Sequence, residues 1–204
     1  MAKTETAKTD TKEIKTTPQA QKAQEFVYDL RIPKDRVAAL IGTKGEVKRQ
    51  IEQATHTKMD VDSNEGDVRL SGKEPLDLYN AREIVQAIGR GFSPERAMML
   101  LRQENGFDMV NLKDYAKNDD DMMRLRGRVI GEEGKSRRLI EEMTGVYISV
   151  YGKTVGIIGE IEGLPIARRA IEALLGGSKH ATVYRWLEGQ RRKIRMRQLS
   201  EGGF

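Results

Sequence analysis

The 204-residue sequence contains no cysteine. This absence excludes a disulfide framework and a zinc–thiolate site, and it is typical of a protein from a reducing compartment. Long apolar runs are absent too. None approaches the roughly 20 residues of a membrane span, and the opening residues MAKTETAKTDTKEIKTT lack the apolar middle of a secretory signal. We therefore expect a soluble, cytoplasmic protein that does not act at a membrane.

The sequence has few side chains in arrangements that could catalyse a reaction. The two histidines, His56 and His180, lie in unrelated parts of the sequence, and no acid pair or nucleophile–base set stands at motif spacing. The segment GEEGKS, residues 131–136, ends like a nucleotide-binding P-loop, but that motif requires glycine at position 129, where the sequence has valine. We therefore expect no enzymatic activity, no cofactor and no metal site.

Positive charge is concentrated in three segments. Residues 31–49 and residues 122–138 each carry six basic and two acidic side chains, and residues 191–197 carry five basic side chains and no acidic one. The net charge of the whole chain is +5, so the remainder of the chain carries −8. A single basic run is usually a solvated helix face, but two matched runs indicate surfaces that meet an anionic partner.

The first 24 residues have a composition unlike the rest. They are mostly threonine, lysine, glutamine, alanine and glutamate, with one isoleucine and one proline. Such a segment buries too little apolar surface to offset the entropy lost on ordering. We predict a flexible tail over residues 1–24.

The chain that follows contains an internal repeat. ALIGTKGEVKRQIEQATHTKMDV at residues 39–61 aligns with RVIGEEGKSRRLIEEMTGVYISV at residues 128–150, so that Gly42 matches Gly131 and Gly45 matches Gly134. A repeat of this length predicts two similar domains. We place the first at residues 25–104 and the second at residues 105–200.

Within each copy the hydrophobic period changes in the same order. Alternating and helical spacings predict a strand, a helix, a glycine loop, a helix, two strands and a helix, and one more helical segment follows each copy. The expected elements cover residues 27–32, 37–41, 47–54, 59–61, 68–70 and 75–88 in the first copy, and 108–112, 119–130, 135–143, 146–150, 155–157 and 166–174 in the second.

Each copy has glycine at both ends of a four-residue loop between two helices. Glycine adopts backbone conformations that other residues avoid, so such a loop can approach another backbone closely. The helix that follows offers free N–H groups and the positive end of its dipole, an arrangement that suits a phosphodiester. One such loop is weak evidence, whereas two loops inside matched basic segments favour nucleic-acid binding.

The pattern I-G-x-x-G-x-x-x-x-x-I, present twice between helices and ahead of a strand pair and a third helix, resembles the KH domain of RNA-binding proteins. The resemblance implies an α+β fold of two tandem KH domains, each a three-stranded antiparallel sheet with three helices, plus an extra helix after each copy. It also implies that each loop clamps the backbone of about four unpaired nucleotides beside an aliphatic groove.

The second copy and its final helix carry a more specific resemblance. LRGRVIGEEGKSRRLIEEMTG, VYGKTVGIIG, IARRAIEALLGG and VYRWLEGQRRK are similar to the archaeal two-KH proteins of small-subunit ribosome assembly. Their eukaryotic counterparts partner the endonuclease that trims the 3′ end of small-subunit rRNA. The resemblance implies binding of single-stranded rRNA near that 3′ end in a pre-small-subunit particle, and contact with the 3′-end rRNA endonuclease and a translation initiation factor.

The resemblance also assigns RNA-binding residues by position, in both loops and in the basic final helix, which would add sequence-independent phosphate contacts. The expected residues are Gly42, Thr43, Lys44, Gly45 and Lys48 in the first copy, Arg126, Arg128, Gly131, Gly134, Lys135, Ser136, Arg137 and Arg138 in the second, and Arg191, Arg192 and Lys193 in the final helix.

The second loop departs from the family pattern, which has a basic residue where this chain has Glu132 and Glu133. Each carboxylate would repel a phosphate by about 1 kcal/mol in wet surroundings. Two interpretations stay open. Either the carboxylates point to solvent while amides and Lys135, Arg137 and Arg138 hold RNA, or this loop clamps poorly and faces a protein.

Two other functions also stay open. An mRNA-binding regulator or a subunit of an RNA-degrading assembly would use the same loops, although degradation subunits usually add a strand-rich OB module that is not visible in this sequence. A protein-docking scaffold would instead use the GEEG loop and the basic helix to bind acidic partners, with no intrinsic affinity for RNA.

Overall fold

The structure is a computed structural model that describes residues 25–201, so the tail predicted over residues 1–24 lies outside the described residues. The first copy comprises β1 (Phe26–Arg31), α1 (Lys34–Ile41), the 3-10 turn η1 (Thr43–Gly45), α2 (Glu46–Ala54), β2 (Lys58–Val61), β3 (Asp67–Gly72) and α3 (Pro75–Gly89), followed by α4 (Pro94–Ala97) and η2 (Met98–Leu101). The second comprises β4 (Asn105–Asn111), η3 (Leu112–Asp114), α5 (Asp119–Ile130), η4 (Glu132–Gly134), α6 (Lys135–Thr144), β5 (Val146–Tyr151), β6 (Thr154–Glu160) and α7 (Leu164–Leu175), followed by α8 (His180–Glu201).

Each copy forms its own three-stranded antiparallel sheet. The strand order is β1-β3-β2 in the first sheet and β4-β6-β5 in the second, so the last strand of each copy lies in the middle. Three helices of the same copy cover one face of each sheet. The predicted α+β class with two three-stranded sheets is confirmed, and the predicted element order holds in both copies.

Local sequence explains where α5 begins and ends. Asn118 accepts a hydrogen bond from the backbone N–H of Asp121 at 2.8 Å, which satisfies one of the free donors at the start of the helix. Three consecutive aspartates, residues 119–121, fill the first turn, where the helix dipole favours negative charge. Gly131 ends the helix with a positive φ of 72°. The helix is therefore held at the residue where the second glycine loop begins.

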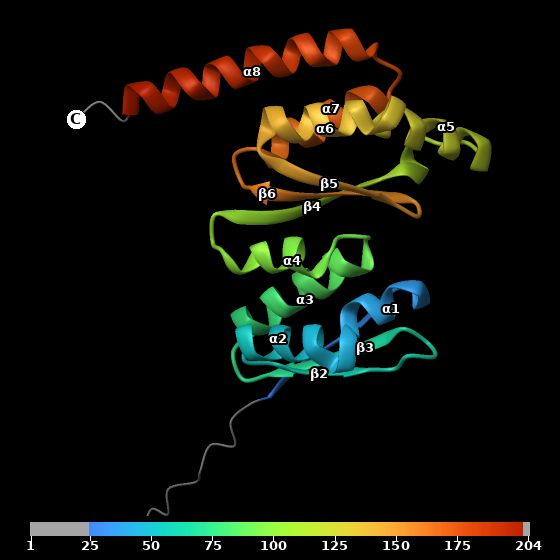
Figure 1. The fold of residues 1–204 in the computed structure, drawn as a ribbon, viewed down its shortest axis with the longest axis vertical. Helices are drawn as coiled ribbons and strands as arrows, with labels where there is room; N and C mark the ends of the chain where they lie inside the picture. Colours follow the sequence, from blue (N-terminus) through green and yellow to red (C-terminus); the bar gives the residue numbers. More distant parts are fainter. Residues whose placement is uncertain (1–24, 202–204) are drawn as a thin grey trace, which may run out of the picture.

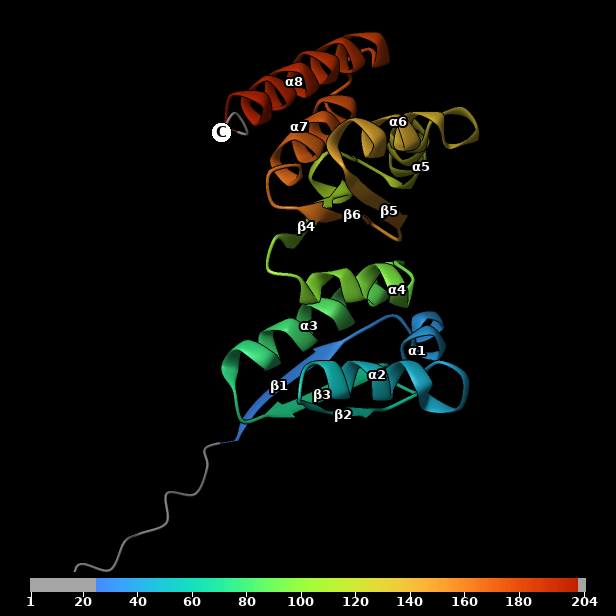
Figure 2. The same ribbon diagram turned by 60° about the vertical axis from the view of Figure 1, so that its left-hand side comes forward.

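The two copies are stacked as layers. In Figure 1 the first sheet lies at the bottom, α3 and α4 lie between the two sheets, and α6 and α7 lie between the second sheet and α8. Figure 2 shows the same order after rotation. The second sheet is therefore covered on both faces, by its own helices on one side and by the first copy on the other.

Side-chain contacts hold the two copies together. Ile158 of β6 belongs to the apolar core of the first copy, and the ring of Phe92 meets that of Phe107 edge to face at 6.3 Å between centroids. A Cβ atom on Gly156 would come within 2.8 Å of the Phe92 ring, so glycine at this position makes room for it. Ser149 Oγ also donates to the carbonyl oxygen of Arg90 at 2.9 Å.

The helical segments after the two copies differ in length. After the first copy the chain makes one α-helical turn that begins at Pro94, then a 3-10 turn, whereas α8 runs for 22 residues. The polar residues RQE, 102–104, connect the first segment to β4. No helix in residues 25–201 combines the length and the apolar character that a membrane span requires.

Candidate nucleic-acid interface

The two glycine loops have the same backbone conformation. The φ angles are 72° at Gly42 and 72° at Gly131, and 75° at Gly45 and 76° at Gly134. In both loops the third residue, Lys44 or Glu133, also has a positive φ, at 53° and 50°. Two sequences that differ at both middle positions therefore produce one loop shape.

The first glycine of each loop is needed for packing. A Cβ atom on Gly42 would lie 2.5 Å from Val47 Cγ2, and one on Gly131 would lie 2.7 Å from Ser136 Cβ. Contacts that short do not occur between real side chains. Val47 and Ser136 occupy equivalent positions in the first turn of the following helix, so each loop folds back onto the helix it starts.

The second glycine of each loop meets open space. No heavy atom lies within 4 Å of a Cβ atom built on Gly45 or Gly134, and the constraint on these residues is their positive φ. A larger residue is therefore strained here but does not collide with the fold. This difference makes the second glycine the better position at which to test ligand binding separately from folding.

Free backbone donors lie in the middle of each loop. The N–H groups of Gly45 and Gly134 donate within their own loops, at 3.3 Å and 3.2 Å. Within residues 25–201, the N–H groups of the two middle residues of each loop donate to no backbone carbonyl. The loops therefore offer unpaired amide donors next to the positive end of α2 or α6, which is the arrangement that binds phosphate.

Basic side chains flank the first loop. Lys44 is exposed at its tip, and Lys48, one turn into α2, is partly buried with Nζ 4.0 Å from Glu52 Oε1. Thr43 is exposed beside Lys44. The predicted residues of this loop are thus gathered at one end of α2.

The second loop brings most of its predicted residues together as well. Glu132, Glu133, Lys135 and Arg138 are exposed, and Arg138 Nη2 donates to the backbone carbonyl of Glu133 at 2.9 Å. This bond fixes the guanidinium of Arg138 beside the loop. The two carboxylates therefore share the loop surface with two cations.

Three buried side-chain polar atoms lack a hydrogen-bond partner in the described part of the chain, and all three belong to residues that lie near the second loop in the sequence, in α5 and the first turn of α6. They are Arg126 Nε, Ser136 Oγ and Arg137 Nε. Arg137 also forms an ion pair with Glu141 at 3.9 Å, which is too long for a hydrogen bond. Buried donors without partners are rare in folded proteins and indicate a place where a ligand or water completes the bonding.

Arg128 is placed differently from the other predicted residues. Its Nε donates to the carbonyl oxygen of Leu174 at 2.9 Å and its Nη2 donates to that of Ser178 at 2.6 Å, so its guanidinium joins α5 to the end of α7. Ser136 has no exposed surface. Both residues thus lie behind the loop rather than on its outer surface.

The basic residues of α8 lie apart from the loops in the sequence and on an exposed surface. Arg191, Arg192 and Lys193 are exposed, and none of them forms an ion pair in the part of the chain that the structure describes. The first half of α8 packs against the second core through Val183 and Leu187. This packing anchors the first half of α8 on the second copy, and the helix continues from there toward its basic end, on the left in Figure 1.

One pair of positions at the loops was missed by the sequence analysis. Ala38 and Gly127 lie four residues before the first loop glycine, are exposed, and accept the hydrogen bond from the N–H of that glycine at 2.9 Å and 2.8 Å. A small residue at this position leaves the helix backbone accessible beside the loop. The signal was available, because the two positions align in the repeat and both carry little or no side chain.

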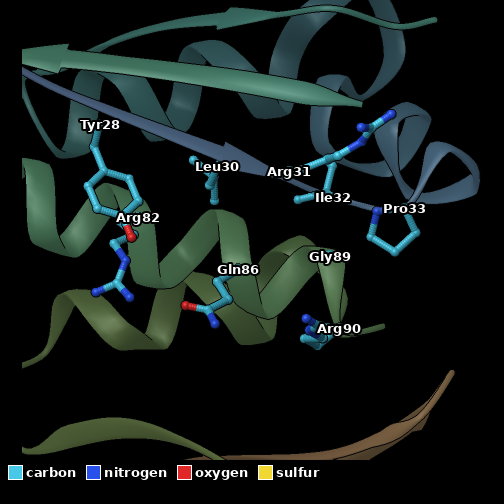
Figure 3. Close-up of a pocket in the computed structure, with 9 residues that line it drawn as sticks. All are labelled: Tyr28, Leu30, Arg31, Ile32, Pro33, Arg82, Gln86, Gly89 and Arg90. Atoms are coloured by element: carbon cyan, nitrogen blue, oxygen red, sulfur yellow. The ribbon is translucent and has the colours of Figure 1, made fainter. Parts of the chain in front are cut away.

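A separate pocket lies between β1 and α3. Figure 3 shows Tyr28 and Leu30 pointing from β1 toward Arg82 and Gln86 on α3, and the Arg82 guanidinium stands 4.9 Å from the centroid of the Tyr28 ring. The cavity measures about 110 Å³, which is too small for a nucleotide. No residue of either glycine loop lines it.

Comparison with known proteins identifies the fold. A model of the second KH domain of PNO1, described as a eukaryotic type KH domain (KH-domain type I), matches residues 106–192, and a KH domain model matches residues 13–87. The chain is therefore a tandem KH-domain protein.

Relatives cover most of the chain. It is 50% identical over 170 residues to a KH domain-containing protein of Methanocaldococcus jannaschii (81% of this chain, 74% of that protein) and 29% identical over 171 residues to the RNA-binding protein pno1 of Dictyostelium discoideum (79% and 70%). It resembles a crystal structure titled as an a/eIF2α–aDim2p–rRNA complex from Pyrococcus horikoshii, with a TM-score of 0.78 and 46% identity over 83% of this chain and 96% of that one. The chain belongs to the PNO1/Dim2p family of two-KH-domain ribosome-assembly proteins.

Proposed function

We propose that this protein binds single-stranded small-subunit rRNA, near its 3′ end, during assembly of the small ribosomal subunit in the cytoplasm, and that it does so without catalysing a reaction. Its relatives are RNA-binding KH proteins, and one related structure is titled as a complex with rRNA and a/eIF2α. The observation that carries the proposal is the pair of arginines, Arg126 and Arg137, whose buried Nε donors lack a hydrogen-bond partner near the second glycine loop.

The residues in and around the loops have different roles in this proposal. The free amides of the middle loop residues, with Lys135 and Arg138, hold a phosphate, while Arg126 and Arg137 complete their bonding with a ligand that lies against α5 and α6. Ser136 and Arg128 support the loop from behind. The first loop, with Thr43, Lys44 and Lys48, binds a second stretch of RNA in the same way, without the two carboxylates.

The second copy contributes the larger share of affinity in this proposal, because the unpartnered donors lie there and not at the first loop. The basic end of α8 adds contacts to phosphates that do not depend on sequence. We divide the chain into domains at residues 25–104 and 105–200. The partners that fit this role are a pre-small-subunit particle, the 3′-end rRNA endonuclease and a translation initiation factor.

A binding titration with substituted glycines tests the proposal. Gly134→Asp places a carboxylate at the loop without a steric clash, so it should weaken binding of a labelled single-stranded rRNA fragment by at least tenfold while the protein stays folded. Gly145→Asp is the matched control. Gly145 has a φ of 71° with open space around its Cβ position, and it lies at the opposite end of α6.

Salt dependence separates the alternatives. Wild-type affinity should fall steeply as salt rises, and the slope should become shallower when Arg191, Arg192 and Lys193 are replaced by glutamine. Equal affinity for Gly134→Asp and Gly145→Asp would remove the second loop from the interface. Preference for duplex over single-stranded RNA, or no RNA affinity beside retained binding of an acidic protein, would contradict the proposal as a whole.

A further inference from the structure

A hollow lies at the junction of the two copies, where α3, η2 and β4 meet. It measures about 450 Å³, and its large apolar lining residues are Leu76 and Tyr79 of α3, Leu100 and Leu101 of η2, Phe107 of β4 and Ile161, just after β6. We call this the junction hollow. The segment that leads into β4, whose residues line the hollow, lies on the left in Figure 1, whereas α1 and α5, which lead into the glycine loops, lie to the right.

Large apolar side chains are exposed around the junction hollow. Leu76 is 66% exposed, Tyr79 is 53% exposed and Ile161 is 57% exposed. They come from both copies, α3 in the first and the β6–α7 turn in the second. Scattered single apolar residues are normal on a surface, but several around one concave site indicate an interaction surface.

The rim of the junction hollow is acidic. Glu83 lines it, Glu160 and Glu162 are the sequence neighbours of the lining residue Ile161, and Glu104 lies between the lining residues Gln103 and Asn105. The backbone carbonyl oxygen of Glu104 accepts a hydrogen bond from the Ile161 N–H at 2.9 Å, which holds these two segments together. Two arginines partly offset the negative charge of these four carboxylates. They are Arg82, which already pairs with Glu83 at 3.6 Å and stacks on Tyr28, and Arg102. A net negative rim repels nucleic acid and attracts a cationic segment.

Glu83 gives a further reason for a cationic occupant. Burial raises the pKa of this carboxyl, and Arg82 only partly counters that effect. A half-buried carboxylate with one partner retains acceptor capacity for a second cation. A lysine or arginine placed at the rim would favour the ionised form of Glu83 and gain a charge-assisted hydrogen bond.

The shape of the site favours a helix as occupant. Leu76 and Tyr79 stand three residues apart on α3 and form an exposed ridge beside the hollow, which is the surface that packs against another helix. Residues 1–24, which precede β1, contain a single isoleucine among their polar residues and supply one apolar anchor at most. The hollow offers apolar contacts from both copies and suits two or more anchors.

We propose that the junction hollow docks a basic amphipathic helix of a partner protein, with leucine-like side chains in the hollow and lysine or arginine against the acidic rim. This surface faces away from the helices that lead into the glycine loops, so RNA and this protein partner can bind at the same time. The proposal stands apart from the RNA-binding function, because it rests on none of the residues assigned to RNA.

A designed peptide tests the proposal on the full chain. The probe is an amphipathic helix of leucine and lysine, about four turns long, and the control peptide has glutamate in place of every lysine. Calorimetry should show binding of the lysine peptide only. Backbone amide shifts in an NMR titration should cluster at residues 76–83, 101–107 and 160–162.

Substitutions in the junction hollow test whether the peptide binds there. Replacement of Leu76, Tyr79 and Ile161 by serine should weaken the lysine peptide by at least tenfold, because these exposed side chains supply the apolar contacts, and it should leave the fold and the RNA affinity unchanged. Met196→Ser, which removes an apolar side chain that is 69% exposed on α8, is the control and should bind the peptide like the wild type. Glu104→Gln with Glu160→Gln should reduce the salt dependence of peptide binding.

Three results would overturn the proposal. The first is equal binding by the serine variant and the wild type, and the second is equal binding of the glutamate peptide. The third is a gain in peptide affinity of tenfold or more after deletion of residues 1–24, because it would assign the hollow to this chain's own tail. Loss of RNA binding in the glycine variants bears on none of these results.

Discussion

Arg128 donates a hydrogen bond from Nη2 to the backbone carbonyl oxygen of Ser178 at 2.6 Å, which fastens α5 to the segment that follows α7. The first copy repeats this device, because Arg36 Nη2 donates to the carbonyl oxygen of Phe92 at 2.7 Å. In each copy an arginine on the first helix donates to two backbone carbonyls, one in the last turn of the last helix and one just beyond it. Both arginines therefore hold the loops in place from within the fold.

Replacement of Arg128 by glutamine should lower the free energy of unfolding by about 2 to 3 kcal/mol, because two hydrogen bonds from a charged group to backbone carbonyls are lost. Urea unfolding measures the change. Arg124→Gln, which removes only an exposed ion pair to Asp121 at 3.1 Å, should stay within about 0.5 kcal/mol of the wild type. Wild-type stability with a large loss of RNA affinity would instead place Arg128 in the RNA interface.

The two glutamates of the second loop should restrain RNA binding. Glu132→Gln with Glu133→Gln removes two negative charges from a loop that otherwise offers amides and cations, so the RNA affinity should rise several-fold at low salt and less at high salt. The reciprocal change, Thr43→Glu with Lys44→Glu, should lower the affinity contributed by the first loop. Fluorescence anisotropy at two salt concentrations measures both. No change in either variant would mean that the loops face something other than RNA.

The order of helices and strands could be predicted from the sequence, because the repeat presents the same pattern of apolar residues twice. The loops were located by four glycines, and the structure brings most of the predicted cations to them. The sequence could not separate Arg128 from Arg138, since both are arginines near the loop. Only the fold shows that Arg128 is bonded to α7 and the segment after it, whereas Arg138 is bonded to the loop itself.

The contact between the two copies was not predicted. Strand β3 alternates apolar and polar residues as a one-sided strand does, whereas six of the seven residues of β6 are buried. The sequence does carry a sign of this contact. Apolar and polar residues do not alternate in β6, because Ile157 and Ile158 are adjacent and position 156 is a glycine. Strands covered on both faces lose alternation. What covers the second face depends on long-range packing that one short strand does not specify.

The hydrogen bond that the Tyr151 hydroxyl donates to the Asp35 carboxylate joins β5 to α1 across the two copies. Burial, and then this hydrogen bond, raise the pKa of Tyr151 above its ordinary value near 10. The folded state thus holds the phenol proton more tightly than the unfolded state does. The stability that Tyr151 contributes is therefore complete below about pH 10 and is lost as the pH rises through the folded-state pKa.

Replacement of Tyr151 by phenylalanine should remove this alkaline sensitivity. Between about pH 9 and pH 11 the wild type should lose stability more steeply than Tyr151→Phe, and urea unfolding across that range measures the difference. The pKa of Tyr115 is also raised by burial, but Tyr115 is present in both proteins, so its effect cancels in the comparison. Parallel pH profiles would show that the contact between Tyr151 and Asp35 does not contribute to stability.

His56 is strained in a way that its counterpart in the second copy is not. It follows the end of α2 with a φ of 48°, and the aligned residue after α6 is Gly145, with a φ of 71°. A side chain in this left-handed region costs about 1 kcal/mol or more, and glycine avoids that cost but loses somewhat more entropy on folding. His56→Gly should therefore raise the free energy of unfolding by up to about 1 kcal/mol.

The exchange in the opposite direction makes the test sharper. Gly145→His should destabilise the second copy by an amount similar to the gain from His56→Gly in the first, because the two positions share one backbone conformation and the Gly145 Cβ position is open. Both changes lie at the far end of their helices from the glycine loops, so neither should alter RNA affinity. If His56→Gly lowers stability, the exposed imidazole makes a contact that outweighs the backbone strain, and this account of the helix end is wrong.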